Sequence, residues 1–171
     1  MIDIAYKHKA ALQTKYIETV DGNPYYKYWN FGSYWDHEGK LGSEDSDLHA
    51  IQRVSIVDGE LLGYFTVRAD RATMEGYSVA LLSFNPGKIN LAFARDAISF
   101  IESLFDDYGM KVLRFVVVDG NPAKSLYDRW VGNHYGRYVG YQEHGTIIGG
   151  EILRTHLYEI TERSYRENKY K

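Results

Sequence analysis

Residues 116 to 130 read VVVDGNPAKSLYDRW, and this stretch predicts a strand that turns sharply into a helix. Three consecutive valines, Val116 to Val118, leave no polar face, which is typical of a strand end buried on both sides. Pro122 suits the first turn of a helix, where its missing N–H costs nothing, and Asn121 before it can cap that helix. Ligands commonly bind where a strand ends at a helix N-terminus. We therefore expect a binding site at this turn.

The segments that precede this turn predict a crossover between two parallel strands. YSVALLSF, residues 77 to 84, is an apolar run that stops at Asn85-Pro86-Gly87. From residue 91 to residue 105 apolar residues recur every three or four positions, which indicates an amphipathic helix, and Gly109 provides its usual stop. KVLRFVVV, residues 111 to 118, returns as a strand. A right-handed crossover then makes strands 77–84 and 112–118 parallel neighbours.

The other segments predict a mixed sheet. Asp58-Gly59 separates two apolar runs within residues 51–69, which indicates a hairpin. GRYVGYQE and EILRTHLYEIT alternate well enough to form a closing antiparallel pair. Residues 9–19 are compatible with a helix, and residues 36–47 gather five carboxylates, which favours a mobile loop. Residues 25–35 hold seven aromatics in eleven positions.

Composition limits the classes of function. A chain of 171 residues is long enough for one domain with a full core and too short for two comfortable ones. The absence of cysteine excludes disulfides, thiolate zinc sites and cysteine nucleophiles, and it fits a cytoplasmic protein. No apolar run approaches the roughly 18 residues of a membrane helix, and the first ten residues contain no signal-peptide core. A net charge of -3 without a long basic run gives little reason to expect a nucleic acid partner.

In the order of its elements, the chain resembles the GCN5-related N-acetyltransferase superfamily over residues 50–161. The sharpest local match is the family's Asn-Pro-Ala and Leu-Tyr block, which falls here on Asn121, Pro122, Ala123, Leu126 and Tyr127. The resemblance implies one α/β domain with a mixed central sheet whose two parallel strands splay apart, diverging toward Phe84 and Val118. It also implies that acetyl-coenzyme A inserts between these strands. Residues 1–50 would then form the acceptor side, residues 50–161 the core, and residues 162–171 a tail.

The resemblance assigns contacts with the coenzyme to nine residues: Ser83, Phe84, Lys88, Ile89, Asn90, Leu91, Ala92, Asn121 and Ser125. The family's phosphate loop normally has Gln or Arg, two residues, Gly, any residue, then Gly or Ala, so that bare backbone N–H groups hold the pyrophosphate. NPGKINLAFARD departs from this pattern, since its one glycine, Gly87, lies early. Ala92 and Ala94 can take the two small positions, with Lys88 in place of the arginine. An ordinary strand-to-helix turn is the alternative interpretation.

The resemblance also implies a role for Tyr127 near the coenzyme sulfur. Direct acetyl transfer to an amine passes through a tetrahedral oxyanion and expels a thiolate, which benefits from a proton. Tyr127 is the candidate general acid, and the alternative is a half-buried tyrosine that only packs. No general base is assigned: strand 77–84 has no carboxylate, Glu75 and Glu143 lie at other places, and Asp36-His37-Glu38 belongs to the acidic loop.

The sequence therefore predicts an acetyltransferase, with a rival. The acceptor is an amine, on a small molecule or on a protein, and aromatic residues 25–35 are either its binding wall or core. The six histidines are scattered without a metal-ligand spacing, so no metal site is expected. The rival is a relative in fold that has lost coenzyme A binding and acts as a binding or regulatory module.

Overall fold

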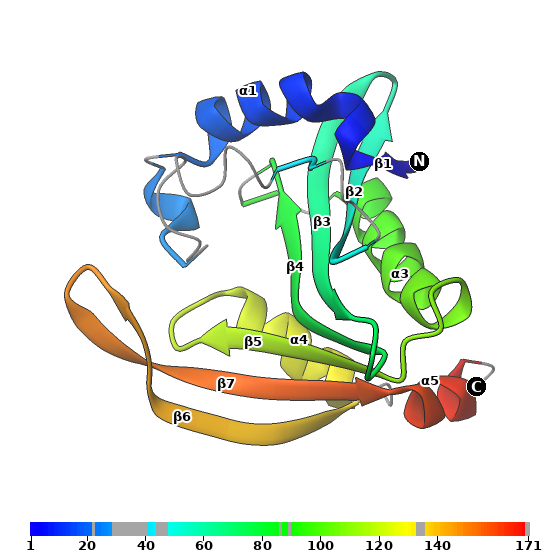
Figure 1. Ribbon diagram of the computed structural model, residues 1–171. Coiled ribbons are helices and arrows are strands. Elements are labelled where there is room, and N and C mark those ends of the chain that lie inside the picture. Colours follow the sequence, from blue (N-terminus) through cyan, green and yellow to red (C-terminus); the bar gives the residue numbers. More distant parts are fainter. Residues whose placement is uncertain are drawn as a thin grey trace.

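The computed structural model describes residues 1–21, 23–28, 41–43, 48–85, 87–88, 90–132 and 136–169. Within these residues the chain forms one seven-stranded sheet in the order β1-β2-β3-β4-β5-β7-β6, covered by helices (Figure 1). The neighbours β4 and β5 run parallel, and the other pairs of adjacent strands are antiparallel.

The strands are β1 (Ile2–Ile4), β2 (Ala50–Val57), β3 (Glu60–Asp70), β4 (Glu75–Ser83), β5 (Val112–Val118), β6 (Arg137–Ile148) and β7 (Glu151–Thr161). The α-helices are α1 (Lys9–Thr19), α3 (Leu91–Asp106), α4 (Ala123–Gly132) and α5 (Glu162–Asn168), and the 3-10 helices are η1 (Ala5–His8) and η2 (Pro24–Tyr26). The predicted hairpin, the long helix, the closing strand pair and the helix at 9–19 are confirmed. At the hairpin turn Asp58 and Gly59 both have positive φ, 52° and 83°, as a tight two-residue turn requires.

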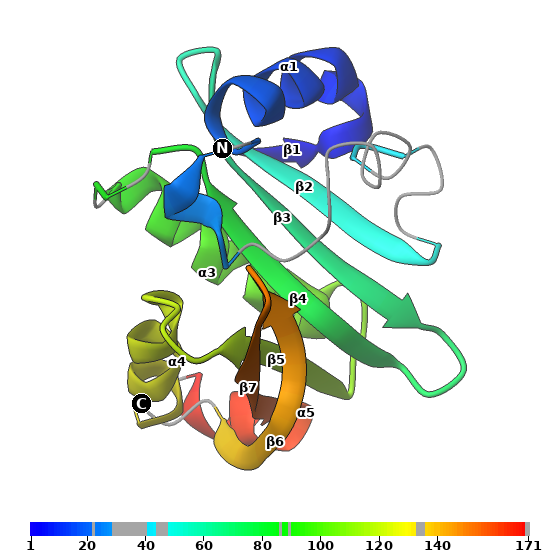
Figure 2. The same cartoon turned by 90° about the vertical axis from the view of Figure 1, so that its left-hand side faces the viewer.

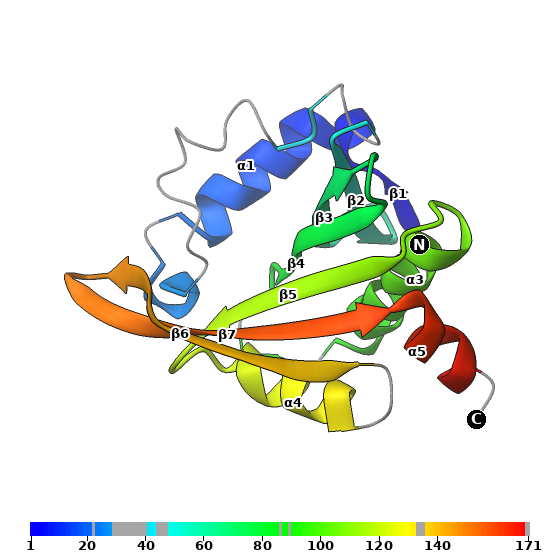
Figure 3. The same cartoon turned by 60° about the horizontal axis from the view of Figure 1, so that its bottom comes forward.

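Two apolar clusters cover the two faces of the sheet. On one face, Leu12 and Tyr16 of α1 pack with residues of β2, β3 and β4, among them Tyr64 and Leu82. The larger cluster on the other face joins α3, α4 and α5 to the sheet, with Phe100 of α3 stacked on Phe65 of β3. Figure 3 shows α4 beneath β5 and β7, with α1 on the opposite side of the sheet.

The predicted parallel pair is confirmed, and its two strands separate soon after they meet. β4 and β5 are paired only at Glu75 with Val112 and Gly76 with Leu113. Just beyond Gly76, β4 contains one extra residue relative to β3, and Ser78 there has a φ of 55°. Such a bulge bends a strand. β4 consequently turns away from β5, and the two diverge toward their carboxyl ends (Figure 1).

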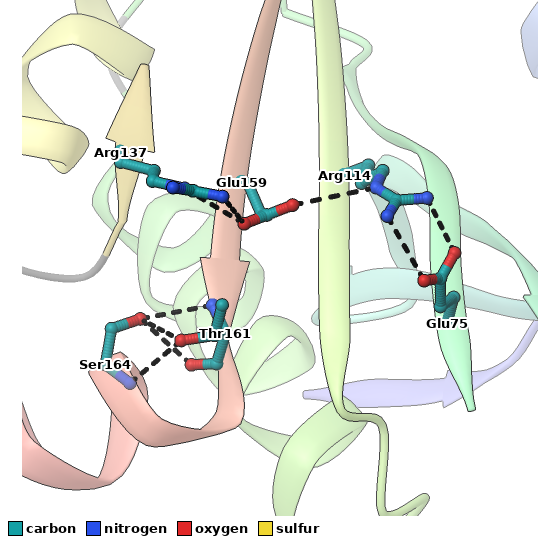
Figure 4. A network of polar contacts seen from close by, with 6 residues as sticks. All are labelled: Glu75, Arg114, Arg137, Glu159, Thr161 and Ser164. Atoms are coloured by element: carbon teal, nitrogen blue, oxygen red, sulfur yellow. Dashed lines mark hydrogen bonds and ion pairs between the residues drawn. The ribbon is translucent and has the colours of Figure 1, made fainter. Parts of the chain in front are cut away.

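A row of ion pairs crosses four strands at the end where β4 and β5 still meet (Figure 4). Arg114 of β5 makes two hydrogen bonds to Glu75 of β4, of 2.6 and 3.1 Å. Arg114 also lies 3.7 Å from Glu159 of β7, which Arg137 of β6 contacts at 2.9 Å. The row ties the strands together at the closed end of the divergence.

The segment that the resemblance assigns to a tail, residues 162–171, contains a helix. Residues 162–168 form α5, which begins with a reciprocal cap between Thr161 and Ser164 (Figure 4). Tyr165 is buried and stacks on Phe105 of α3, with ring centroids 4.6 Å apart. The Tyr165 ring packs on α3 and its hydroxyl donates to Asp106 of α3 at 2.8 Å, so both contacts dock the helix. Among the described helices, none is both long and apolar enough to cross a membrane.

Candidate active site

The gap between β4 and β5 presents backbone hydrogen-bonding groups from both sides. The Phe84 N–H donates to the Leu62 carbonyl on β3. Successive residues of a strand direct their backbone N–H and C=O groups to opposite sides, so those of Leu81 and Ser83 point away from β3 and toward the gap. The Asp119 N–H, just after β5, donates to the Arg154 carbonyl on β7. By the same alternation, the backbone N–H and C=O groups of Val116 and Val118 point away from β7 and toward the gap.

Few of these groups have a partner within the described part of the chain. The Val118 carbonyl accepts from the Asn121 N–H at 3.1 Å, and the Ser83 carbonyl accepts from the Tyr26 hydroxyl at 2.8 Å. No hydrogen bond among the described residues uses the backbone groups of Leu81 or Val116. Backbone groups seldom remain without a partner in the interior of a protein. The gap therefore suits an extended ligand that carries amides of its own.

Two helices begin beside the open ends of these strands. Asn121 caps α4, since its side chain accepts from the Ala123 N–H at 2.9 Å. Ser125, also predicted to contact the coenzyme, is exposed on α4 and donates to the Pro122 carbonyl at 3.0 Å. Asn90 caps α3 and accepts from the N–H groups of Ala92 and Phe93 at 3.0 and 3.1 Å. The Asn90 side chain thus occupies donors that a phosphate would otherwise use at this helix terminus.

The surroundings of the α3 terminus are of mixed charge. Lys88 is exposed there, and so is Leu91, whereas Ile89 lies outside the described residues. Beside Asn90 and Ala92 lies an open hollow of about 380 Å³, whose other wall carries Asp58 and Glu60 of the β2–β3 turn. These carboxylates would repel an anion placed in the hollow.

Tyr127 lies beneath β5 and β7. Its ring centroid is 5.6 Å from that of Phe115 and 5.8 Å from that of Tyr158, and only 8% of the residue is exposed. Burial raises the pKa of Tyr127 to about 12. Its hydroxyl makes no hydrogen bond to any residue that the structure describes.

The chain resembles known proteins in structure and not in sequence. No family model matches the sequence, and no curated protein matches it in sequence. Spermidine N-acetyltransferase from Vibrio cholerae, in complex with CoA and spermine, superimposes with a TM-score of 0.74 at 13% identity, over 97% of each chain. A probable GNAT-family acetyltransferase from Chromobacterium violaceum gives 0.72 at 14% identity, over 97% of this chain and 88% of that one. A GCN5-related N-acetyltransferase from Brucella melitensis gives 0.70 at 14% identity, over 99% and 78%.

The chain has the GCN5-related N-acetyltransferase fold. In this acetyltransferase fold, Ser83 and Phe84 lie at the end of β4, with the Phe84 side chain buried in the cluster under α1. Asn121 follows β5 and caps α4, and Ser125 lies in the first turn of that helix. The predicted contacts thus fall at the end of β4, just after β5 and at the start of α3, where Asn90 caps the helix.

The two carboxylates weighed as bases are both engaged elsewhere in the acetyltransferase fold. Glu75 is held by Arg114 at the closed end of the gap, and Glu143 pairs with Arg154 at 3.1 Å on the β6–β7 hairpin. The acidic Asp36-His37-Glu38 and aromatic residues 29–35 lie outside the described residues. Among the described residues, no three His, Cys, Asp or Glu side chains are grouped to hold a metal ion.

Two tyrosines of the aromatic run lie at the site. Tyr26 reaches the end of β4, as noted above, and the Tyr28 hydroxyl lies against Gly120 just after β5. Only the family resemblance assigns this run to the acceptor side. The high density of aromatic residues was the available signal, but contacts across more than 50 residues leave no local pattern.

Proposed function

We propose that the protein is an acyltransferase that moves an acetyl group from acetyl-CoA to a primary amine by direct transfer. The observation that carries the proposal is the gap, which the backbone groups of Leu81 on β4 and Val116 on β5 face without a partner among the described residues. The pantetheine arm of coenzyme A is extended and contains two amides, so it can satisfy both strands at once. The structural neighbour crystallised with CoA supports this donor.

The phosphate end of the donor would be held mainly by side chains. The Asn90 carbonyl oxygen caps α3, which leaves the Asn90 amide N–H₂ as a donor, and Lys88 adds a positive charge nearby. Asn121 and Ser125 would border the donor from α4. This arrangement differs from a loop of bare backbone N–H groups, and it follows from the lack of a glycine at Ala92 and Ala94.

The transfer itself needs few groups from the protein. The neutral amine nitrogen attacks the thioester carbonyl carbon, and a backbone N–H of the gap stabilises the oxyanion. The carbon–sulfur bond then breaks to release the thiolate, and the nitrogen gives up one proton to water, which leaves the neutral amide. Tyr127 keeps its proton at every ordinary pH, because its pKa is about 12. Full proton transfer from Tyr127 to the thiolate is unfavourable, because the thiol formed has a pKa of only about 8.5. Tyr127 would therefore act chiefly by donating a hydrogen bond to the departing sulfur.

The rival is a protein of the same fold that has lost coenzyme A binding and acts as a binding or regulatory module. Two observations favour it: the Asn90 cap on the α3 N–H groups, and the carboxylates of Asp58 and Glu60 beside that terminus. Both weaken attraction for a pyrophosphate. The backbone groups that face the gap favour the enzyme.

Thermal unfolding with acetyl-CoA separates the two candidates. Ligand at 100 times its Kd stabilises a protein that binds it by about 2.7 kcal/mol. We expect acetyl-CoA to raise the unfolding temperature of the parent protein saturably, and to raise that of the Lys88→Glu variant less. We also expect release of free thiol when a primary amine is added. No rise at millimolar acetyl-CoA would reject the enzyme and leave the rival. A rise without thiol release for any amine would indicate a coenzyme-binding module instead.

A further inference from the structure

His156 is a buried histidine beside the carboxyl end of β5. It lies on β7, opposite Val117 of β5, and only 8% of the residue is exposed. β5, β7 and β6 are successive strands of the sheet, and α4 packs beside them (Figures 1 and 2). His156 takes no part in the chemistry of the proposed transfer. A buried polar side chain needs hydrogen-bond partners, and those of His156 indicate what it holds.

Both ring nitrogens of His156 have partners on other elements. Nε2 lies 2.6 Å from an oxygen of the Asp119 carboxylate, in the turn after β5, and Nδ1 lies 2.9 Å from the Tyr138 hydroxyl on β6. An ionised carboxylate only accepts hydrogen bonds, so Nε2 carries a proton and donates to Asp119. In the neutral ring, Nδ1 then accepts from the Tyr138 hydroxyl. The two contacts hold the imidazole in one orientation, directed at Asp119.

His156 is the main partner of the Asp119 side chain, which is 43% exposed. Of the side chains that the structure describes, His156 alone makes a hydrogen bond or ion pair with this carboxylate. The hydrogen bond from His156 is the largest cause that holds the pKa of Asp119 below its ordinary value of 3.8. The carboxylate is therefore ionised at neutral pH. Hydrogen bonds to an ionised group are shorter and stronger than those between neutral groups.

Asp119 belongs to the turn that leads from β5 into α4. The Val118 carbonyl accepts from the Asn121 N–H at 3.1 Å, and Gly120 within the turn has a φ of 80°. Asn121 then caps α4. The proposed donor would lie against both ends of this turn, because the Val118 N–H faces the gap and Asn121 would border the donor from α4.

We propose that His156 is a positioning residue, which holds Asp119 and so fixes the turn between β5 and α4 against which the acyl donor binds. The proposal rests on the acetyl transfer proposed above. β5 separates β7 from the gap, so His156 acts through Asp119. The backbone hydrogen bond between Asn121 and Val118 is local, whereas the contact with His156 ties the turn to β7 and, through Tyr138, to β6. Loss of that contact should loosen the turn without unfolding the protein.

Two amide substitutions separate the contacts of His156. From the same Cβ, the amide nitrogen of Gln reaches about as far as Nε2, and that of Asn only as far as Nδ1. His156→Gln can therefore still donate to Asp119, whereas His156→Asn cannot. We expect His156→Asn to weaken acetyl-CoA binding about tenfold, the order of one hydrogen bond to a charged group, and His156→Gln to remain within about threefold of the parent. Calorimetric titration measures both.

His8 provides the matched control. Its Nε2 lies 2.9 Å from the Asp3 carboxylate on β1, the strand at the other edge of the sheet. His8→Asn breaks a comparable contact far from β5 and should leave the affinity for acetyl-CoA unchanged. Equal affinities of the parent and His156→Asn would overturn the proposal. Equal losses in His156→Asn and His156→Gln would overturn it too, because they would show that the contact with Asp119 is not what matters.

Asp119→Ala tests whether His156 acts through Asp119. In the Asp119→Ala background, His156→Asn should have no further effect on the affinity, whatever the loss of the Asp119 charge does by itself, because the contact is already gone. An undiminished tenfold effect of His156→Asn in that background would mean that the two residues act independently, and it would overturn the proposal.

The hold on the turn is measured without any ligand, by hydrogen exchange of the Asn121 N–H. We expect this N–H to exchange about tenfold faster in His156→Asn than in the parent, and at nearly the parent rate in His156→Gln. The Ala94 N–H, which donates to the Asn90 carbonyl at 2.9 Å in α3, is the internal reference and should not change. Equal exchange of the Asn121 N–H in all three proteins would overturn the proposal.

The positioning role and the proposed transfer fail separately. If the parent binds acetyl-CoA and releases thiol, and His156→Asn does so equally well, the role of His156 is overturned and the transfer stands. A parent protein that does not bind acetyl-CoA would overturn the transfer and the positioning role together, while hydrogen exchange still decides whether His156 holds the turn.

Discussion

Glu75 and Arg114 are joined by two hydrogen bonds, of 2.6 and 3.1 Å, at the last point where β4 and β5 still pair. The carboxylate is thus committed to holding the closed end of the gap, and it lies at the far end of β4 from Ser83. A paired arginine fork of this kind fixes geometry as well as charge. This contact explains how the two strands can diverge without the sheet separating.

Glu75→Gln should lower the free energy of unfolding by about 0.5–1 kcal/mol, because the pair is partly exposed and belongs to a network. Acetyl transfer should continue at nearly the parent rate. Chemical denaturation and a thiol-release assay measure the two quantities. Glu143→Gln, which breaks the comparable pair with Arg154 on the hairpin, is the matched control. A large loss of turnover with Glu75→Gln alone would make Glu75 a catalytic base.

Asn90→Asp separates the two roles of Asn90. Asp caps a helix as well as Asn does, so the free energy of unfolding should barely change. The same substitution places a negative charge where the donor's phosphates are proposed to bind, so the affinity for acetyl-CoA should fall about tenfold or more. Calorimetric titration measures the affinity. Asp58→Asn removes a repulsive charge and should raise the affinity. Unaltered binding in both variants would show that the phosphates do not bind beside α3.

Tyr127→Phe keeps the ring and removes the hydroxyl. General acid catalysis contributes typically 10²- to 10⁴-fold, and a tyrosine of raised pKa that only donates a hydrogen bond belongs near the lower limit. We expect kcat to fall about 100-fold with little change in acetyl-CoA affinity. The parent's rate should show no loss from Tyr127 deprotonation up to pH 10, since its pKa is about 12. Full activity in the variant would leave Tyr127 as a packing residue.

The docking of α5 should depend on pH through Asp106. Hydrogen bonds from Lys169, and then from Tyr165 and Arg166, hold the pKa of Asp106 below its ordinary value of 3.8. A carboxyl whose pKa is lower in the folded state stabilises that state above its ordinary pKa, and the stabilisation is lost as the pH falls through the lower value. Asp106→Asn should therefore lower stability at pH 7 and reduce its decline below about pH 4. Unfolding temperatures between pH 2 and pH 7 test this, with Glu167→Gln on α5 as the control. An equal acid decline in the parent and in Asp106→Asn would contradict it.

Much of the fold could be predicted because it depends on local patterns. The Asp58-Gly59 turn, the apolar period of α3 and the cap at Asn121 each act within a few residues. The Asn90 cap has the same kind of signal, a polar residue before an apolar helix.

The parts that could not be predicted rest on contacts between distant residues. Arg114 meets Glu75 and Glu159 from two different strands, and Tyr26 meets Ser83, which lies 57 positions away in the sequence. Such pairs leave no period or spacing in the sequence. The helix α5 was missed for a related reason, since a seven-residue polar helix has little pattern of its own and depends on Tyr165 docking against α3.

The most direct test of the central claim is a titration of the amide resonances of Leu81, Ser83, Val116 and Val118 with acetyl-CoA. These N–H groups face the gap, and the proposed donor lies between them. We predict saturable shifts of these signals from both strands with one common Kd, larger than those of Gly109, which follows α3 and lies near Met74 at the closed end of the gap. Unmoved signals on both strands at millimolar acetyl-CoA would contradict the proposal that the gap between β4 and β5 binds the acyl donor.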